Sequence, residues 1–212
     1  MTPDLVSKQT SDVAGFNKEV FYKDSFWFKI KNHYDTLINL SAIEKGSDSF
    51  ELRFWIDQQI TDGDHVFIVK YQNNKCEIYN YFFNEYEDED LQLKNFNNFS
   101  YNIGKNPFFI CHKISVDEID LKNLFENTGI ESLPTQSSLK NYRGCCLDGT
   151  VYFIEIATKN SYKFCVYENP SCCKDNLDKN QQFLNFISSF EKLLPKEEFC
   201  WPRCILKSPQ TN

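Results

Sequence analysis

The sequence lacks the short motifs that mark the common catalytic and nucleotide-binding sites. Its 212 residues contain none of three such motifs: G-x-S-x-G, G-x-G-x-x-G and H-E-x-x-H. Gly144 and Gly149 have the spacing of the two glycines in a phosphate-binding loop, but Thr150 and Val151 stand where that loop requires lysine and then serine or threonine. Without the lysine that contacts the phosphates, the motif does not indicate a nucleotide site.

Histidine is scarce, with only His33, His65 and His112 in the whole chain. Much acid–base and metal chemistry near neutral pH depends on this residue. Cys111 and His112 are adjacent, as a nucleophile and its base would be, but neighbouring side chains in a strand point to opposite faces. The pair therefore does not predict a thiol protease.

Basic residues are fewer than acidic ones: 23 lysines and arginines against 30 aspartates and glutamates give a net charge of −7. Binding the phosphate backbone calls for a basic surface, so this balance argues against nucleic acid as a partner. Anionic lipid is disfavoured for the same reason. The charge has the right sign for docking onto a basic protein.

Long apolar runs are also missing, and none approaches the roughly 20 residues that span a bilayer. The polar N-terminus lacks the apolar core of a secretion signal. A cytoplasmic protein and an exported protein whose signal has been removed both fit this pattern. No linker rich in proline, glycine or serine divides the chain, so we expect a frayed segment over residues 1–18 and one domain over residues 19–212.

The clearest structural signal is a predicted hairpin of two strands, Thr150–Ala157 and Tyr162–Tyr167, both rich in aromatic and β-branched residues. The polar residues 158–161 close it. Both faces are mostly apolar, which places the hairpin in mid-sheet with cover on each side. Glu155 is the exception and would need a partner if buried. The predicted register pairs Ala157 with Tyr162, Glu155 with Phe164 and Phe153 with Val166.

Two helices are predicted to pack on the sheet. The first covers about 116–127, since Ser115 and Glu118 have capping-box spacing and Gly129 follows where a C-terminal glycine belongs. The second covers about 179–193, with Asp178 as its cap and Pro195 after its end. Its apolar stripe recurs every three or four residues and consists of Phe183, Leu184, Phe186, Ile187, Phe190, Leu193 and Leu194.

Further strands are predicted from alternation and from turn residues. Asn73-Asn74 suits a tight turn between two of them because asparagine tolerates positive φ. The expected strands are Phe26–Ile30, Leu37–Ile43, Phe50–Asp57, His65–Tyr71, Cys76–Phe83 and Phe108–Lys113. Together with the hairpin they indicate an α+β fold: an antiparallel meander sheet of about six to eight strands with two packed helices.

The segment from 144 to 195 resembles a pattern found in uncharacterised bacterial proteins, some of them lipoprotein-like. The resemblance is carried by Leu147-Asp148-Gly149-Thr150, Tyr152, Ile154-Glu155, Pro170 and Phe183-Leu184. It implies a bacterial origin and includes no catalytic residues, so it implies no activity.

One candidate metal site lies in a predicted turn. Asp62, Asp64 and His65 offer three ligands for a divalent cation such as Ca²⁺, Mn²⁺ or Zn²⁺. Gly63 also makes the segment an ordinary hairpin turn. Both interpretations stay open, and no cofactor is otherwise expected.

An acidic run forms a candidate partner-binding patch. It consists of Glu85, Glu87, Asp88, Glu89 and Asp90. A run of this kind is typical of a solvated loop; its functional interpretation is a surface for a cationic partner or a loose Ca²⁺ site.

Cysteines crowd the C-terminal region. Of nine in the chain, Cys172, Cys173, Cys200 and Cys204 flank the second predicted helix. In an exported protein they could pair as disulfides that tie the tail to the sheet; in the cytoplasm they would stay reduced. Disulfides, buried thiols and a zinc site all remain open, and the pairing is undetermined.

These observations leave three hypotheses for function. The first is a non-catalytic protein-interaction or binding module, exported from a bacterium. The second is a cytoplasmic immunity protein or inhibitor that covers a basic toxin or enzyme with an acidic surface. The third is an enzyme whose Asp, Glu and His residues are too scattered for sequence spacing to reveal.

Overall fold

The computed structural model describes residues 17–21, 24–37, 39–58, 64–72, 75–83, 109–139, 142, 149–172 and 177–194. Within them lie seven strands: β1 (Asn17–Val20), β2 (Phe50–Gln58), β3 (Asp64–Gln72), β4 (Lys75–Phe83), β5 (Phe109–Ser115), β6 (Thr150–Thr158) and β7 (Ser161–Glu168). The helices are α1 (Ser25–Leu37), α4 (Glu118–Thr128) and α5 (Leu177–Leu193), with two 3-10 turns, η2 (Ile130–Ser132) and η3 (Gln136–Ser138). None of the helices in this part of the chain is long and apolar enough to cross a bilayer.

The strands form one sheet in the order β1-β7-β6-β2-β3-β4-β5. Strands β2 to β5 are the predicted meander, and the β6–β7 hairpin lies beside β2 in the predicted register, with Glu155 opposite Phe164. The sheet is mixed and not wholly antiparallel, because β1 pairs in parallel with β7. Strand β1 includes Asn17 and Lys18, which the sequence alone placed in a frayed terminus.

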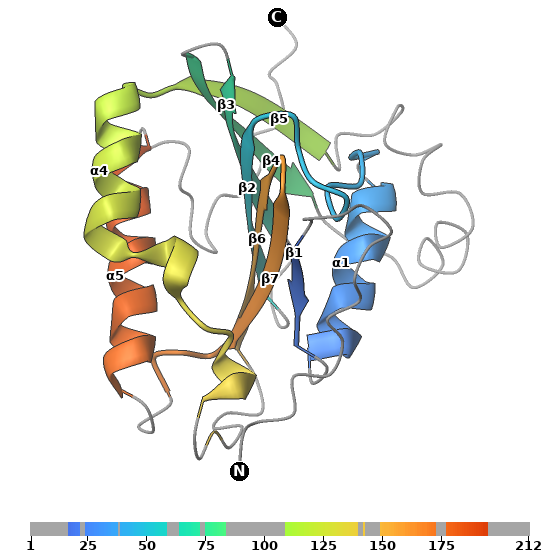
Figure 1. The fold of residues 1–212 in the computed structure, drawn as a ribbon, viewed down its shortest axis with the longest axis vertical. Coiled ribbons are helices and arrows are strands. Elements are labelled where there is room, and N and C mark those ends of the chain that lie inside the picture. The colour runs from blue at the N-terminus through green and yellow to red at the C-terminus, as the bar shows by residue number, and fades with distance from the viewer. Residues whose placement is uncertain are drawn as a thin grey trace, which may run out of the picture.

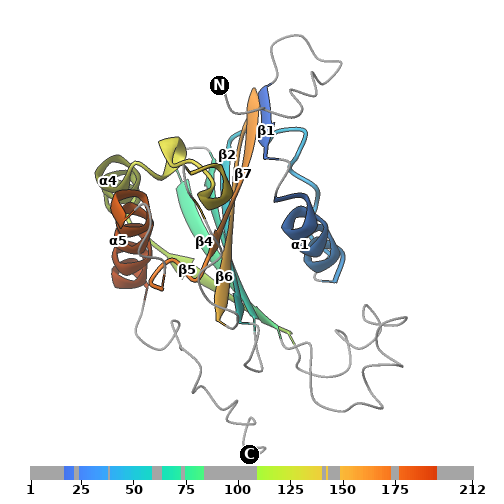
Figure 2. The same cartoon turned by 90° about the horizontal axis from the view of Figure 1, so that it is seen from below.

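Helices cover both faces of the sheet. Figures 1 and 2 show α4 and α5 together on one face and α1 on the other. Because successive side chains of a strand point to opposite faces, each inner strand supplies two cores. This explains why β3 and β6 read as nearly continuous apolar runs.

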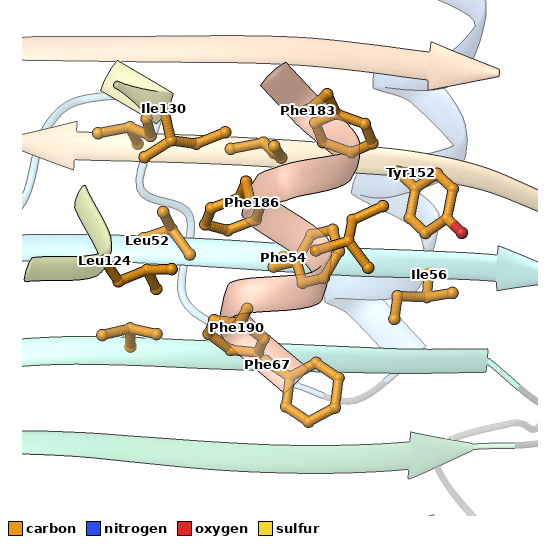
Figure 3. Packing of buried hydrophobic residues seen from close by; sticks show 14 of the residues in the cluster. Leu52, Phe54, Ile56, Phe67, Leu124, Ile130, Tyr152, Phe183, Phe186 and Phe190 are labelled. Atoms are coloured by element: carbon orange, nitrogen blue, oxygen red, sulfur yellow. The ribbon is translucent and has the colours of Figure 1, made fainter. Parts of the chain in front are cut away.

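The larger core lies under α5. Phe183, Phe186 and Phe190 point from this helix onto the sheet, as Figure 3 shows, and all three are fully buried. They surround Phe54 of β2, whose ring centroid is 5.3 Å from that of Phe186. A single buried phenylalanine contributes roughly 1.5–3 kcal/mol. The predicted apolar stripe is therefore confirmed as the contact face of the helix.

Helix α1 replaces the strand predicted over Phe26–Ile30. The strand prediction put Phe26, Phe28 and Ile30 on one side, but Phe26 is 60% exposed. The side chains that turn inward are Trp27, Lys31 and Tyr34, at helical spacing. Their polar atoms made this stripe hard to recognise as an inward face.

The segment after α1 is not a strand either. Leu40 to Ile43, the described part of the predicted strand over residues 37–43 that follows the helix, has no regular structure. Asn39 has a φ of 55°, a left-handed conformation that helps the chain leave the helix.

The N-cap of helix α4 lies two residues after Ser115, the predicted cap. Asp117 is the N-cap, and its side chain accepts a hydrogen bond from the backbone N–H of Ile119 at 2.9 Å. Gly129 ends the helix in the left-handed conformation with a φ of 60°, as predicted. Helix α5 begins at Leu177, so Asp178 lies in its first turn instead of capping it.

Candidate functional site

The proposed metal ligands Asp64 and His65 are neighbours at the start of β3 and point to opposite faces of the sheet. His65 shares the α5 side with Phe67, whereas Asp64 is on the α1 side. The structure does not bring these two side chains together, and Asp62 lies outside the described residues. In the described ranges no group of three or more His, Cys, Asp or Glu side chains could hold a metal ion.

His65 is held in an apolar environment. Its ring stacks on Phe67 with 5.9 Å between the ring centroids and 5° between the planes. Its Nδ1 lies 3.4 Å from the side-chain oxygen of Asn80. Burial lowers the pKa of His65 to about 4, against the opposing effect of Asn80, so the ring is neutral at pH 7.

The other predicted site residues fall mainly outside the described chain. These are the acidic run Glu85, Glu87, Asp88, Glu89 and Asp90, and the cysteines Cys173, Cys200 and Cys204. Cys172 is exposed in the turn after β7. Partner binding by the acidic run and a disulfide to Cys172 therefore stay predictions.

A charged cluster is buried between α1 and the sheet. We use this name for Lys31, Asp35, Glu44, Glu51, Arg53 and Glu155. At its centre Lys31 is fully buried, and its Nζ lies 2.9 Å from Asp35 Oδ2, 3.0 Å from Glu44 Oε1 and 3.0 Å from Glu155 Oε1. Three carboxylates thus compensate one ammonium group.

Arg53 binds the opposite side of the same cluster. Its Nε donates to Glu51 Oε1 at 2.8 Å, and its NH1 group donates to Asp35 Oδ1 at 2.9 Å. Its NH2 group donates to the backbone oxygen of Ser41 at 2.6 Å. Planar, forked donors suit arginine to such a buried, multiply bonded position.

Glu155 is the buried charge that the sequence singled out, and it has three partners. Besides Lys31, Trp55 Nε1 donates to its Oε2 at 2.9 Å and the Tyr162 hydroxyl donates to its Oε1 at 2.9 Å. Every polar atom of this carboxylate is engaged inside the protein. The cluster accordingly holds α1 on the sheet, and its charges face one another instead of a ligand.

The pKa of Asp35 reflects the excess of carboxylates in the charged cluster. Burial and the charge of Glu155 raise it to about 6, although Lys31 and Arg53 pull the other way. Burial would lower the pKa of Lys31, but the carboxylates of Glu155 and Asp35 outweigh it and raise the pKa. The lysine therefore stays charged at neutral pH.

A pocket opens on the other face of the sheet, beside α4. We call it the α4 pocket; its volume is about 370 Å³, and its lining consists of Phe50, Tyr71, Glu118, Leu121, Lys122, Phe125, Glu126 and Glu131. Pockets that hold small ligands span roughly 300–1,000 Å³, so this one is at the small end. It fits one side chain or a compact molecule.

The floor of the pocket is apolar. Phe50 of β2 and Phe125 of α4 are both half-buried, with their ring centroids 5.1 Å apart. Leu121, one turn earlier on α4, is buried beside them. Partly exposed rings next to a cavity leave apolar surface that a ligand could cover.

The rim of the pocket is acidic. The hydroxyl of Tyr71 donates to Glu118 Oε1 at 2.8 Å, which fixes that carboxylate at the rim. The pKa of neighbouring Cys76 is raised to about 11 by burial and by the charges of Glu118 and Glu77. Burial is the larger cause of this shift, and the two carboxylates raise the pKa further.

One lysine, Lys122, is part of the pocket lining. Its Nζ is 3.7 Å from Glu126 Oε1, with both side chains exposed. An exposed pair of this kind contributes at most about 1 kcal/mol, so Lys122 can be displaced.

The α4 pocket is not predicted by any pattern in the sequence. Its residues come from β2, β3, α4 and η2, which are far apart in the chain. One signal was available: Ile119 is an apolar residue in the first turn of a helix, and it proves to be 66% exposed. At helical spacing it lies beside Lys122 and Glu126, so it extends the apolar surface past the rim.

Comparison with known proteins adds no function to this geometry. No protein-family model matches the chain, and no curated protein matches it. The resemblance of residues 144–195 to bacterial lipoprotein-like proteins therefore stays a prediction.

Proposed function

We propose that this protein is a non-catalytic binding module and that the α4 pocket holds its ligand. The observation that carries the proposal is the pocket itself, where an apolar floor made by Phe50, Leu121 and Phe125 opens to a rim of carboxylates. A concave apolar surface with a few convergent polar groups is the usual form of a ligand site.

The distribution of charge inside the protein supports a binding role. The charged cluster pairs Lys31 with Glu155, and Arg53 with Glu51, under α1. His65 is neutral and stacked on Phe67, away from the described lining of the pocket. In the described residues, the pocket thus combines apolar contact area with carboxylates and has no histidine to act as a base near pH 7.

A fragment screen by two-dimensional NMR on the full chain tests the proposal. Small aromatic fragments should shift the amide resonances of Leu121, Phe125 and Glu126 and leave those of α1 unchanged. Phe125→Ser removes part of the apolar floor and should abolish these shifts; a matched change on the outer side of α4, Asn127→Ser, should keep them. Binding elsewhere, or no binding, would contradict the proposal.

A second candidate is an inhibitor or immunity protein that covers a basic toxin or enzyme. The carboxylates at the pocket rim favour it, together with the net charge of −7. This function predicts a stoichiometric complex that weakens as salt rises, because interactions between exposed charges are screened over about 10 Å at 0.1 M. Neutralising the run Glu85 to Asp90 should weaken the same complex if that run contributes.

A further inference from the structure

We infer that the α4 pocket recognises a segment of a partner protein in which an apolar side chain is flanked by lysine or arginine. This inference rests on the proposed function and specifies the ligand. The floor supplies apolar contact through Phe50 and Phe125, whose rings lie 5.1 Å apart. The rim supplies carboxylates. A ligand that fits both floor and rim therefore needs an apolar group and a cationic group.

The sign of the rim charge determines the class of partner. Glu118, Glu126 and Glu131 contribute three carboxylates to the lining, against the ammonium group of Lys122. Glu118 is positioned by the Tyr71 hydroxyl at 2.8 Å and cannot turn away without losing that bond. An acidic ligand would meet a negative potential here, whereas a cationic one would be attracted.

Helix α4 extends the contact surface beyond the pocket. Ile119 is 66% exposed and lies on the same side of the helix as Lys122 and Glu126. An extended peptide lying across this side could place an apolar side chain over Phe50 and Phe125, with its neighbours reaching the carboxylates. A pocket of about 370 Å³ next to an exposed isoleucine suits such a segment better than an isolated ion.

Lys122 is the feature that makes the inference testable. Its Nζ lies 3.7 Å from Glu126 Oε1 and so occupies the position that a ligand cation would take. Both side chains are exposed, and the pair is weak. Removing the lysine should therefore strengthen binding of a cationic ligand, while removing the glutamate should weaken it.

The experiment titrates three capped pentapeptides into the labelled full chain and follows the amide resonances of α4. The probes are Gly-Lys-Leu-Lys-Gly, Gly-Glu-Leu-Glu-Gly and Gly-Lys-Ser-Lys-Gly. We expect only the first to shift the resonances of Leu121 and Phe125. Lys122→Gln should tighten its binding about two- to fivefold and Glu126→Gln should weaken it by a similar factor, as expected for exposed charge pairs.

Asp120→Asn provides the matched control. Asp120 is an exposed carboxylate in the first turn of the same helix and is not part of the pocket lining. Its neutralisation changes the net charge by the same one unit as Glu126→Gln, and we expect it to leave peptide affinity unchanged. Equal weakening by both variants would mean that overall charge attracts the peptide, and the inference would be wrong.

The outcomes separate this inference from the proposed function. If aromatic fragments enter the pocket but the lysine and glutamate peptides bind equally, the binding module stands and the basic segment does not. A small aromatic cation, phenethylammonium, is titrated as a fourth probe. If it shifts the pocket resonances and no peptide does, the ligand is a small cation, and the inference is again overturned. If nothing enters the pocket, both proposals fail.

Discussion

Lys31 Nζ lies 3.0 Å from Glu155 Oε1, and neither side chain has any exposed surface. One residue comes from α1 and the other from the middle of β6, so this ion pair joins the helix to the sheet at the centre of their interface. Placing charges there is costly, and only the surrounding hydrogen bonds make it tolerable.

Removing one member of this pair should destabilise the protein strongly. Lys31→Met leaves Asp35, Glu44 and Glu155 without their shared cation, and we expect the free energy of unfolding in urea to fall by roughly 3–5 kcal/mol. The double variant Lys31→Met, Glu155→Gln also removes one of the buried carboxylates left unpaired, so its loss should be smaller than the two single losses added together. Additive losses would show that the two groups do not interact.

The exposed pair Lys122 and Glu126 provides the comparison. Its atoms are 3.7 Å apart, with both side chains mostly in solvent. Lys122→Met should change the free energy of unfolding by less than about 1 kcal/mol. A similar loss at Lys31 and at Lys122 would contradict the role assigned to the charged cluster.

Asp35 should make the protein less stable as pH rises from about 4 to 6. Its pKa is about 6 in the folded state, because burial and Glu155 favour the protonated form, and about 4 in an unfolded chain. Between these values the folded state binds the extra proton, so the free energy of unfolding falls by up to about 1.4 kcal/mol per pH unit. Urea unfolding measured at a series of pH values checks this. In Asp35→Asn, the fall in the free energy of unfolding between pH 4 and 6 should be absent.

His65 should act in the opposite direction over an overlapping range. Its pKa is about 4 when folded, because burial favours the neutral ring, and about 6.5 when unfolded. The unfolded chain therefore binds more protons between these values, and stability rises with pH until about 6.5. The His65→Gln profile should lack this rise. If the free energy of unfolding of this variant rises between pH 4 and 6.5 as it does in the wild type, the ring titrates normally in the folded protein.

Gly149 should not tolerate a side chain. It has a φ of 155°, and a Cβ built there would lie 1.7 Å from Asn169 Oδ1. That oxygen accepts a hydrogen bond from the Thr150 N–H at 2.8 Å, so it is held in place. We expect Gly149→Ala to lower the free energy of unfolding by about 1–3 kcal/mol. Asn169→Gly removes the side chain that the new Cβ would meet. It should therefore lower the free energy of unfolding less in the Gly149→Ala variant than in the wild type.

The β6–β7 hairpin and α5 could be predicted because their signals are local. A short polar turn fixes the register that places Glu155 opposite Phe164, and the spacing of Phe183, Phe186 and Phe190 specifies a helix face. Strands β2 to β4 follow from alternation and turn residues in the same way. In these elements, residues close together in the sequence specify the local structure.

Helix α1 and the α4 pocket could not be predicted in this way. The aromatic run from Phe26 to Ile30 suits a strand, but it lies in a helix whose Lys31 pairs with Glu155 of β6. The pocket exists only where Phe50 meets Phe125 across the fold. Both depend on partners supplied by distant segments, which periodicity in one sequence does not reveal.

The insertion of the hairpin between β1 and β2 has a consequence for synthesis on the ribosome. Strand β2 pairs with β6, and β1 pairs with β7, so both early strands must wait until residue 168 has emerged. Until then Phe54 and Trp55 lack their β6 partners, Ile154 and Phe153. Nascent chains with such exposed apolar surface are prone to aggregate. A product truncated before β6 would lack two strands of the sheet, so the residues from Thr150 onward determine whether the fold can be completed.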